Sequence, residues 1–186
     1  MRTDQRSQVL KILDSALLFD DRDRAEAATI IAFVRAHPDC LERSNLAGHL
    51  TASAFVVDRE RRHLLLIHHK ALGRWLQPGG HADGDPDLLA VARREVREET
   101  GLDQLHPITT RPFDLDIHSI PERKGIPEHL HYDVRFLFEA DGGSVLQGDE
   151  REVHGARWVP LSDDSDLNLD ESVLRAVRRI GELSPS

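Results

Sequence analysis

The chain has 186 residues, of which 39% are hydrophobic and 31% are charged, and its formal net charge is −9 at pH 7. This balance predicts one soluble globular domain with a core of its own, and the acidic charge argues against broad binding to nucleic acid or anionic membranes. Cys40 is the only cysteine, so no intramolecular disulfide can form, and we expect a reducing, cytoplasmic compartment. No stretch approaches the ~20 apolar residues of a membrane span, and we expect neither secretion nor membrane insertion.

Residues 1–45 are predicted to form a helical extension. Apolar side chains recur at helical spacing through the first helix, and Asp20 or Asp21 can cap a second one. His37 ends this second helix, because the residue before a proline avoids the helical region. The pattern leaves open whether the extension packs on the domain, makes a dimer contact or shapes the entrance to a site.

Sequence patterns typical of β-strands begin after the extension. The apolar runs Leu50–Asp58 and His63–His69 predict two strands, and the polar residues 58–62 predict the hairpin turn between them. Trp75 follows, either as a core anchor or as a cover over a ligand, and packing is the commoner role of an aromatic side chain.

The stretch Gly79–Leu102 begins with a Gly-rich turn and continues as a helix predicted over residues 86–100. Asp85 or Asp87 can accept hydrogen bonds from the free N–H groups of its first turn. Gly101 ends the helix, because glycine accepts the left-handed conformation that follows a last turn.

On a helical wheel, the apolar stripe of this helix continues into Glu95, Glu98 and Glu99. Carboxylates at these spacings repel one another, and burying them unpaired costs several kcal/mol. A hard divalent cation relieves the repulsion, because magnesium and its relatives prefer oxygen ligands. The alternative is a solvated helix end with ordinary Glu/Arg surface pairs.

The residues from Gly80 to Leu102 resemble the signature box of the Nudix hydrolases over 23 positions without a gap. The matching residues are Gly80, Arg94, Glu95, Val96, Glu98, Glu99, Gly101 and Leu102. Pro86 stands where the pattern has its first Glu, which in the family mainly supports the box arginine, here Arg94. Asp85 and Asp87 flank Pro86 and can supply a carboxylate one residue out of step.

The resemblance implies an α/β fold, namely a Nudix-like α/β/α sandwich with a mixed sheet, in which residues 46–186 form the Nudix domain. It also implies that Glu95, Glu98, Glu99 and the backbone carbonyl of Gly79 hold Mg²⁺ or Mn²⁺.

A further carboxylate is expected outside the box. A Glu six residues before a strand tryptophan resembles the additional metal ligand of Nudix hydrolases, which selects Glu152, with Glu150 as the second choice. The alternative is a surface acidic loop.

Two alternating segments, residues 113–117 and 130–138, predict an antiparallel strand pair with one polar face. This polar face carries Asp114, Asp116, His118, His129, His131, Asp133 and Arg135. One interpretation is a solvated sheet face. The other is a wall of the substrate pocket, where Arg135 and the histidines bind phosphate and Asp133 lies beside them. A second metal site is a further alternative, because the His-x-His-x-Asp spacing permits it. Residues 170–180 predict a final amphipathic helix.

The predicted function is metal-dependent hydrolysis of a pyrophosphate bond in a nucleoside diphosphate linked to another moiety, such as a nucleotide sugar, a dinucleotide or a nucleoside triphosphate. The catalytic set is Arg94, Glu95, Glu98 and Glu99, and Glu95, Glu99 and Glu152 all stay open as the base. The partner is a small molecule, and a homodimer is left open.

Two alternatives remain. Pro86 favours a nucleotide-sensing module that has lost catalysis. An enzyme like the isoprenoid-diphosphate isomerases is disfavoured, because Cys40 lies in the helical extension and not in a strand near the pocket.

Overall fold

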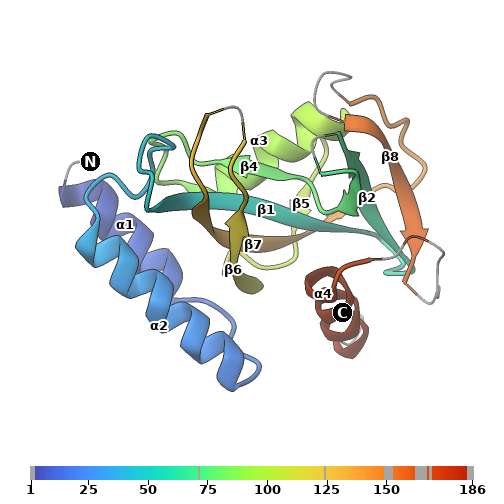
Figure 1. Cartoon of the computed structure of the whole chain (residues 1–186). Coiled ribbons are helices and arrows are strands. Elements are labelled where there is room, and N and C mark those ends of the chain that lie inside the picture. The colour runs from blue at the N-terminus through green and yellow to red at the C-terminus, as the bar shows by residue number, and fades with distance from the viewer. Residues whose placement is uncertain are drawn as a thin grey trace. The chain divides into compact units, whose positions relative to one another are not determined.

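The computed structural model describes residues 3–70, 72–123, 125–148, 153–161, 167 and 169–183. The helices of this described part are α1 (Thr3–Asp14), α2 (Asp21–Ala36), α3 (Leu88–Thr100) and α4 (Glu171–Glu182). Its strands are β1 (Gly48–Asp58), β2 (His63–His69), β3 (Arg74–Leu76), β4 (Gly79–His81), β5 (His106–Pro107), β6 (Asp114–Ile120), β7 (His129–Ala140) and β8 (Val153–Pro160). Figure 1 shows the path of the chain through these elements.

Strand pairing follows the order β3, β2, β1, β7 and β5, with β4 beside β1, β6 beside β7 and β8 beside β2. The chain divides into two compact units. The first comprises Met1–Ser53, Gly79–Ala92 and Thr109–Phe136, and the second comprises Ala54–Pro78, Arg93–Ile108 and Leu137–Ser186. The elements β1, α3 and β7 contribute residues to both units.

In the first unit, α1 and α2 pack against each other and α2 packs against β6 (Figure 1). The side chain of Asp20 caps α2 by accepting a hydrogen bond from the N–H of Asp23. His37 ends the helix in an extended conformation, as the proline after it predicts. The predicted cap and end of the second helix are therefore confirmed.

The N-terminal helices attach to the sheet through specific contacts. Arg22 on α2 donates to Asp116 of β6 at 2.8 Å and to the carbonyl of Leu115 at 3.2 Å. The rings of Phe33 and Tyr132 stack with their centroids 4.0 Å apart. Of the roles left open for the extension, packing on the strands that follow is therefore the one present in the structure.

A buried ionic network lies between β6 and β7. Arg135 is cross-strand to Asp114, and its guanidinium donates to Asp133 at 2.7 Å, Asp114 at 3.1 Å and Asp116 at 3.0 Å. The side chain of Arg135 is 3% exposed. Burial alone would lower the pKa of Arg135, but the three carboxylates raise it well above its ordinary value. Asp133 also accepts hydrogen bonds from the hydroxyls of Thr51 and Ser53.

Arg135 and Asp133 as substrate ligands stay predictions, and the network shows what these side chains already contact. The three nitrogens of the guanidinium already pair with aspartates, and β7 buries both side chains. A phosphate that approached this guanidinium would have to compete with buried carboxylates that already pair with it, so the structural contribution of the two residues is to join β6 and β7.

In the second unit, β2 pairs antiparallel with β3, with β8 and with the end of β1. The β1–β2 turn closes on Asp58, whose carboxylate accepts from the backbone N–H groups of Arg62 and His63. The helix α4 begins after Asp170, which caps it by accepting from the N–H of Val173.

Replacing Arg135 with Met is expected to lower the free energy of unfolding by about 3–5 kcal/mol, because three buried carboxylates lose their common counter-charge. Urea denaturation measures this loss. Arg59→Met, in the exposed β1–β2 turn, is the control and is expected to change stability by less than about 0.5 kcal/mol. Equal stability of both variants would show that the network is dispensable.

Candidate functional site

The helix α3 begins at Leu88, two residues later than predicted, because the residues before it form the cap. The carboxylate of Asp87 accepts from the N–H of Ala90 at 3.1 Å, and that of Asp85 accepts from the N–H of Asp87 at 2.9 Å. Both aspartates therefore take the capping role that the sequence predicts. In the structure both carboxylates bind backbone N–H groups at the start of the helix.

The buried face of α3 starts apolar and ends acidic. Leu88, Val91, Ala92 and Val96 are fully buried, and the stripe continues into Glu95 and Glu99, which are 8% and 2% exposed. A buried carboxylate needs a compensating charge or hydrogen bonds.

The prediction that three carboxylates point inward is wrong for one of them. The side chain of Glu98 is 53% exposed. At about 100° per residue, Glu98 lies at the edge of the buried stripe, about 100° from Glu99, and the structure leaves this edge exposed at the last turn of the helix.

Arg94 lies beside the acidic side chains. Its guanidinium donates to the carboxylate of Glu95 at 2.8 Å, and its Nε lies 4.0 Å from a carboxylate oxygen of Glu98. The arginine thus orients one buried and one exposed carboxylate of the same helix end. Oxygen donors of this kind match the preference of hard divalent cations such as Mg²⁺ and Mn²⁺.

The C-terminal end of α3 is closely packed by a distant segment of the chain. Gly101 takes a left-handed conformation at φ 77°, as predicted for the helix stop. The N–H of Gln147 donates to the carbonyl of Thr100 at 2.8 Å. A Cβ atom on Gly148 would lie 1.9 Å from the carbonyl oxygen of Glu99, so only glycine allows this approach. The predicted ligands Glu150 and Glu152 come soon after in the sequence but lie outside the described residues.

Gly79 belongs to the first unit, at the start of β4. It pairs with Ser53 of β1, and a Cβ atom on Gly79 would lie 2.3 Å from the Cβ atom of Ser53. The glycine is therefore required by strand packing. Its carbonyl as a metal ligand stays a prediction.

The predicted histidines of the β6–β7 face form a cluster with two others that the sequence reasoning missed. The ring centroid of His131 lies 5.5 Å from that of His118, 5.3 Å from that of His129, 4.8 Å from that of His49 and 5.1 Å from that of His81. The missed signal was the alternation at the start of β1, where His49, Thr51 and Ser53 share one face.

Burial sets the charge of these imidazoles. Burial, followed by the neighbouring imidazoles and, for His81, also Arg43, lowers the pKa of His131 to about 2 and that of His81 to about 4. Burial also lowers the pKa of His49. His131 is therefore uncharged near neutral pH, and its role as a substrate ligand stays a prediction. His118 and His129 as substrate ligands stay predictions.

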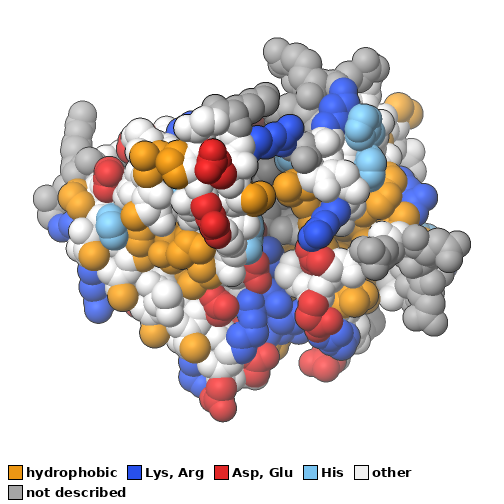
Figure 2. Space-filling view, viewed as in Figure 1, with side chains coloured by type: hydrophobic (Ala, Val, Ile, Leu, Met, Phe, Trp, Pro, Cys, Tyr) orange, Lys and Arg blue, Asp and Glu red, His pale blue; other side chains and the backbone are white. Residues whose placement is uncertain are grey.

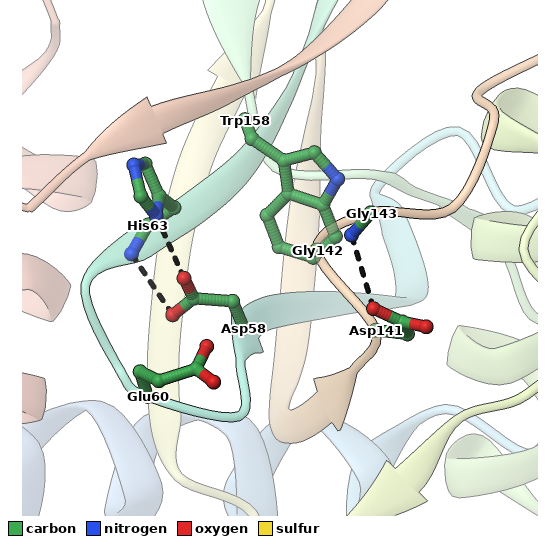
Figure 3. Close-up of a pocket in the computed structure, with 7 residues that line it drawn as sticks. All are labelled: Asp58, Glu60, His63, Asp141, Gly142, Gly143 and Trp158. Carbon is green, nitrogen blue, oxygen red and sulfur yellow. Dashed lines mark hydrogen bonds and ion pairs between the residues drawn. The ribbon is translucent and has the colours of Figure 1, made fainter.

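The second unit contains a pocket of about 280 Å³. It is lined by Asp58, Glu60, His63, Asp141, Gly142, Gly143 and Trp158 (Figure 3). Asp58 and His63 face each other across 2.7 Å, and Asp141 accepts from the N–H of Gly143. None of the predicted site residues within the described part of the chain lines it.

Trp75 is only partly buried, and it pairs with other side chains of the same unit. The guanidinium of Arg157 lies 4.6 Å from its ring centroid, and the ring of His68 lies 5.1 Å away. The tryptophan is therefore held by a cation–π contact at its surface.

Acidic and basic side chains are intermixed on the face of the molecule shown in Figure 2. Among the helices in the described ranges, none combines the length and apolarity required to span a membrane.

Comparison with known proteins places the chain in a family. Residues 48–179 match the model of the NUDIX domain, and the chain belongs to the Nudix family, as its box predicts.

Phosphatase NudJ of Escherichia coli K12 is 32% identical over 120 residues, which cover 62% of this chain and 70% of NudJ. Nudix hydrolase 6 of Arabidopsis thaliana is 22% identical over 126 residues, which cover 64% of this chain but only 42% of that protein. These relatives support the predicted class of enzyme, a Nudix pyrophosphohydrolase.

Among solved structures, the binary complex of a C. elegans Ap4A hydrolase aligns with a TM-score of 0.56 and 19% identity, over 71% of this chain and 94% of that one. At this identity the likeness concerns the fold, and it confirms the predicted Nudix-like α/β architecture with a mixed sheet.

Gly148→Ala is expected to lower the free energy of unfolding by about 1–3 kcal/mol, because the added methyl group collides with the carbonyl of Glu99 and forces a backbone shift. Gly155→Ala in β8 is the matched control, since a Cβ atom there meets no other atom within 4 Å. Thermal and urea unfolding of the two variants compare them, and a Gly148 variant as stable as the control would disprove the tight contact.

The stability contributed by Asp58 is expected to depend on pH. Burial alone would raise the pKa of Asp58, but hydrogen bonds from the side chain of His63 and from backbone N–H groups hold it below its ordinary value. A lowered folded-state pKa stabilises the protein above the unfolded value of about 3.9, and this contribution disappears as the pH falls through the folded-state pKa.

The stability difference between the natural protein and Asp58→Asn should therefore be largest near neutral pH and shrink below about pH 4. Urea denaturation over a series of pH values measures it. Glu60→Gln, in the exposed part of the same turn, should show no such dependence. A difference that stays constant down to the lowest pH would refute the assignment.

Proposed function

We propose that this Nudix protein is a metal-dependent hydrolase that cleaves the pyrophosphate bond of a nucleoside diphosphate linked to another moiety. The observation that carries the proposal is the burial of Glu95 and Glu99 on the box helix, with Glu98 exposed beside them. Two carboxylates one helical turn apart repel each other in a site of low dielectric, and a divalent cation offsets that repulsion.

The donor set fits Mg²⁺ or Mn²⁺, because it consists of carboxylate oxygens. The proposed ligands are Glu95, Glu98 and Glu99, together with the carbonyl of Gly79 and the carboxylate of Glu152. The packing of Gln147 and Gly148 on the last turn of α3 supports Glu152, because that residue follows in the same segment. A bound cation of this kind neutralises phosphate charge and lowers the pKa of a coordinated water.

The side chains of the chain itself have separate tasks. Arg94 holds the carboxylate of Glu95 through a charge-assisted hydrogen bond, so this ligand keeps one orientation. Glu99 is fixed by burial, whereas Glu98 reaches toward solvent, where a substrate arrives. Proton removal from the attacking water requires a carboxylate that the cation does not saturate, and Glu95, Glu99 and Glu152 are the candidates.

The substrate class follows from the same chemistry and from the relatives. A diphosphate spreads negative charge over several oxygens, which a metal held by carboxylates can bind without a basic surface. The names of the matched proteins, an Ap4A hydrolase and a phosphatase of the Nudix family, support a nucleotide anhydride as the substrate. The partner is then a small molecule, and a cytoplasmic location follows from the lone cysteine.

Two other functions are less well supported. A nucleotide-sensing module is favoured by Pro86, which stands where the box has its first Glu. The neighbouring Asp85 and Asp87 accept from backbone N–H groups at the start of the helix, so their carboxylates are engaged there. An isomerase of the isoprenoid-diphosphate type would need a reactive thiol. Cys40 is fully buried, and burial followed by the charge of Asp39 raises its pKa to about 11, so its thiolate is scarce.

Glu99→Gln and Glu98→Gln are each expected to lower Mg²⁺-dependent turnover by at least about 100-fold, because each removes a charged oxygen ligand. Phosphate release is measured on nucleotide sugars, dinucleoside polyphosphates and nucleoside triphosphates, with and without Mg²⁺. Glu182→Gln, exposed on α4, is the control and should retain full turnover.

Unchanged turnover in both glutamine variants would refute the mechanism. Nucleotide binding without hydrolysis across the whole panel would favour the sensing module instead.

A further inference from the structure

We propose that His49, His129 and His131 form a second metal site that binds a Zn²⁺-class ion and is chemically distinct from the carboxylates of α3. One possible ligand atom of each residue lies within 4.8 Å of those of the other two. His49 comes from β1, and His129 and His131 alternate along β7, so all three project from neighbouring strands of the first unit.

The strand geometry explains why the three rings meet. Residues two apart on a strand share one face, which places His129 and His131 side by side. The ring centroid of His49 lies 5.1 Å from that of His129 and 4.8 Å from that of His131. The site is therefore built from regular strands, whose backbone pairing holds the rings in place.

Two buried nitrogens of the cluster have no partner. Among the described residues, the Nε2 atoms of His49 and His131 are buried and make no hydrogen bond. The residue His49 is 2% exposed, so water does not solvate its ring. An unsatisfied buried polar atom costs about 1–3 kcal/mol, and two of them aimed at the same cluster call for a common ligand.

The other ring nitrogens favour the same arrangement. Nδ1 of His129 lies 2.8 Å from the carbonyl oxygen of Pro127, and Nδ1 of His49 lies 3.5 Å from the carbonyl oxygen of Asn45. A backbone carbonyl accepts only from a protonated Nδ1, which leaves the lone pair on Nε2 for a metal. Histidine ligands in metalloproteins are commonly oriented by such a contact on their second nitrogen.

The donor type selects the ion. Three imidazole nitrogens without a carboxylate suit Zn²⁺ and its borderline neighbours, whereas Mg²⁺ and Mn²⁺ prefer oxygen. Zn–N bonds of about 2.0–2.1 Å place the nitrogen atoms of tetrahedral ligands about 3.4 Å apart. The ligand atoms of the three histidines lie within 4.8 Å of one another, so each distance between them must shorten by about 1.4 Å at most. Rotation about the side-chain torsions of His129 and His131, which are both only partly buried, allows this movement.

His81 lies at the edge of the site. Its ring centroid is 5.0 Å from that of His49, and its backbone is in register with Thr51. The residue sits two positions after Gly79 in β4, so an ion held here would fix β1, β7 and the strand that leads into the box. The consequence is a structural metal that stabilises the Gly-rich turn of the first unit.

The test uses the untagged full chain, stripped with EDTA and then kept in saturating Mg²⁺ so that carboxylate sites are filled. Zn²⁺ is titrated by calorimetry, and Co²⁺ is used as a coloured probe of nitrogen ligation. The expected result is one Zn²⁺ per chain, a Co²⁺ spectrum typical of a four-coordinate site and a rise in the melting temperature with Zn²⁺.

Variants locate the ion. His131→Gln and His129→Gln should each weaken Zn²⁺ binding by at least about tenfold, whereas His106→Gln, an exposed histidine of β5, should bind as the natural protein does. Glu99→Gln should also keep the Zn²⁺ site, because it belongs to the other metal centre. Circular dichroism and melting in EDTA confirm that each variant is folded, and the partly exposed His129 provides a second variant if His131→Gln does not fold.

Three outcomes would overturn the proposal: no stoichiometric Zn²⁺ binding, binding unaffected by either folded histidine variant, or binding lost in Glu99→Gln.

Discussion

The burial of Glu95 and Glu99 one turn apart on α3 is the constraint on which the functional interpretation depends. The helix reaches this arrangement because its apolar stripe, from Leu88 through Val96, continues into acidic residues at the same spacing. A fold stabilised by only ~5–15 kcal/mol cannot leave two such carboxylates uncompensated. Arg94 compensates part of this charge through its hydrogen bond to Glu95, and we propose that a divalent cation binds beside these carboxylates.

The first unit also buries carboxylates, but an arginine lies among them. Asp114, Asp116 and Asp133 are buried as well, but Arg135 lies among them and pairs with each. An arginine supplied by the chain remains in place and offsets part of the charge of these three carboxylates, with Arg22 pairing with Asp116 as well. The acidic end of α3 differs in that its carboxylates include Glu98, which is 53% exposed and open to ions from solution.

The histidines present a third case, in which burial removes charge instead of balancing it. His49 and His131 have buried Nε2 atoms without a hydrogen-bond partner among the described residues, and imidazole nitrogens of this kind suit a borderline metal. The same strand face that carries the Arg135 network at one end carries the His49–His129–His131 cluster at the other. One polar face thus carries a buried ionic network at one end and the proposed metal site at the other.

Local features were predictable from the sequence because they depend on neighbours along the chain. The caps at Asp20 and Asp87, the helix stop at Gly101, the alternating strands and the Nudix box all belong to this group. Tertiary packing decided the rest, since periodicity tells which residues share a face but not what covers that face. Only the fold brought Arg22 and α2 onto β6, joined His49 and His81 to His131, packed Gly148 on the last turn of α3 and left Glu98 in solvent. These outcomes depend on segments far apart in sequence, whose approach no local pattern records.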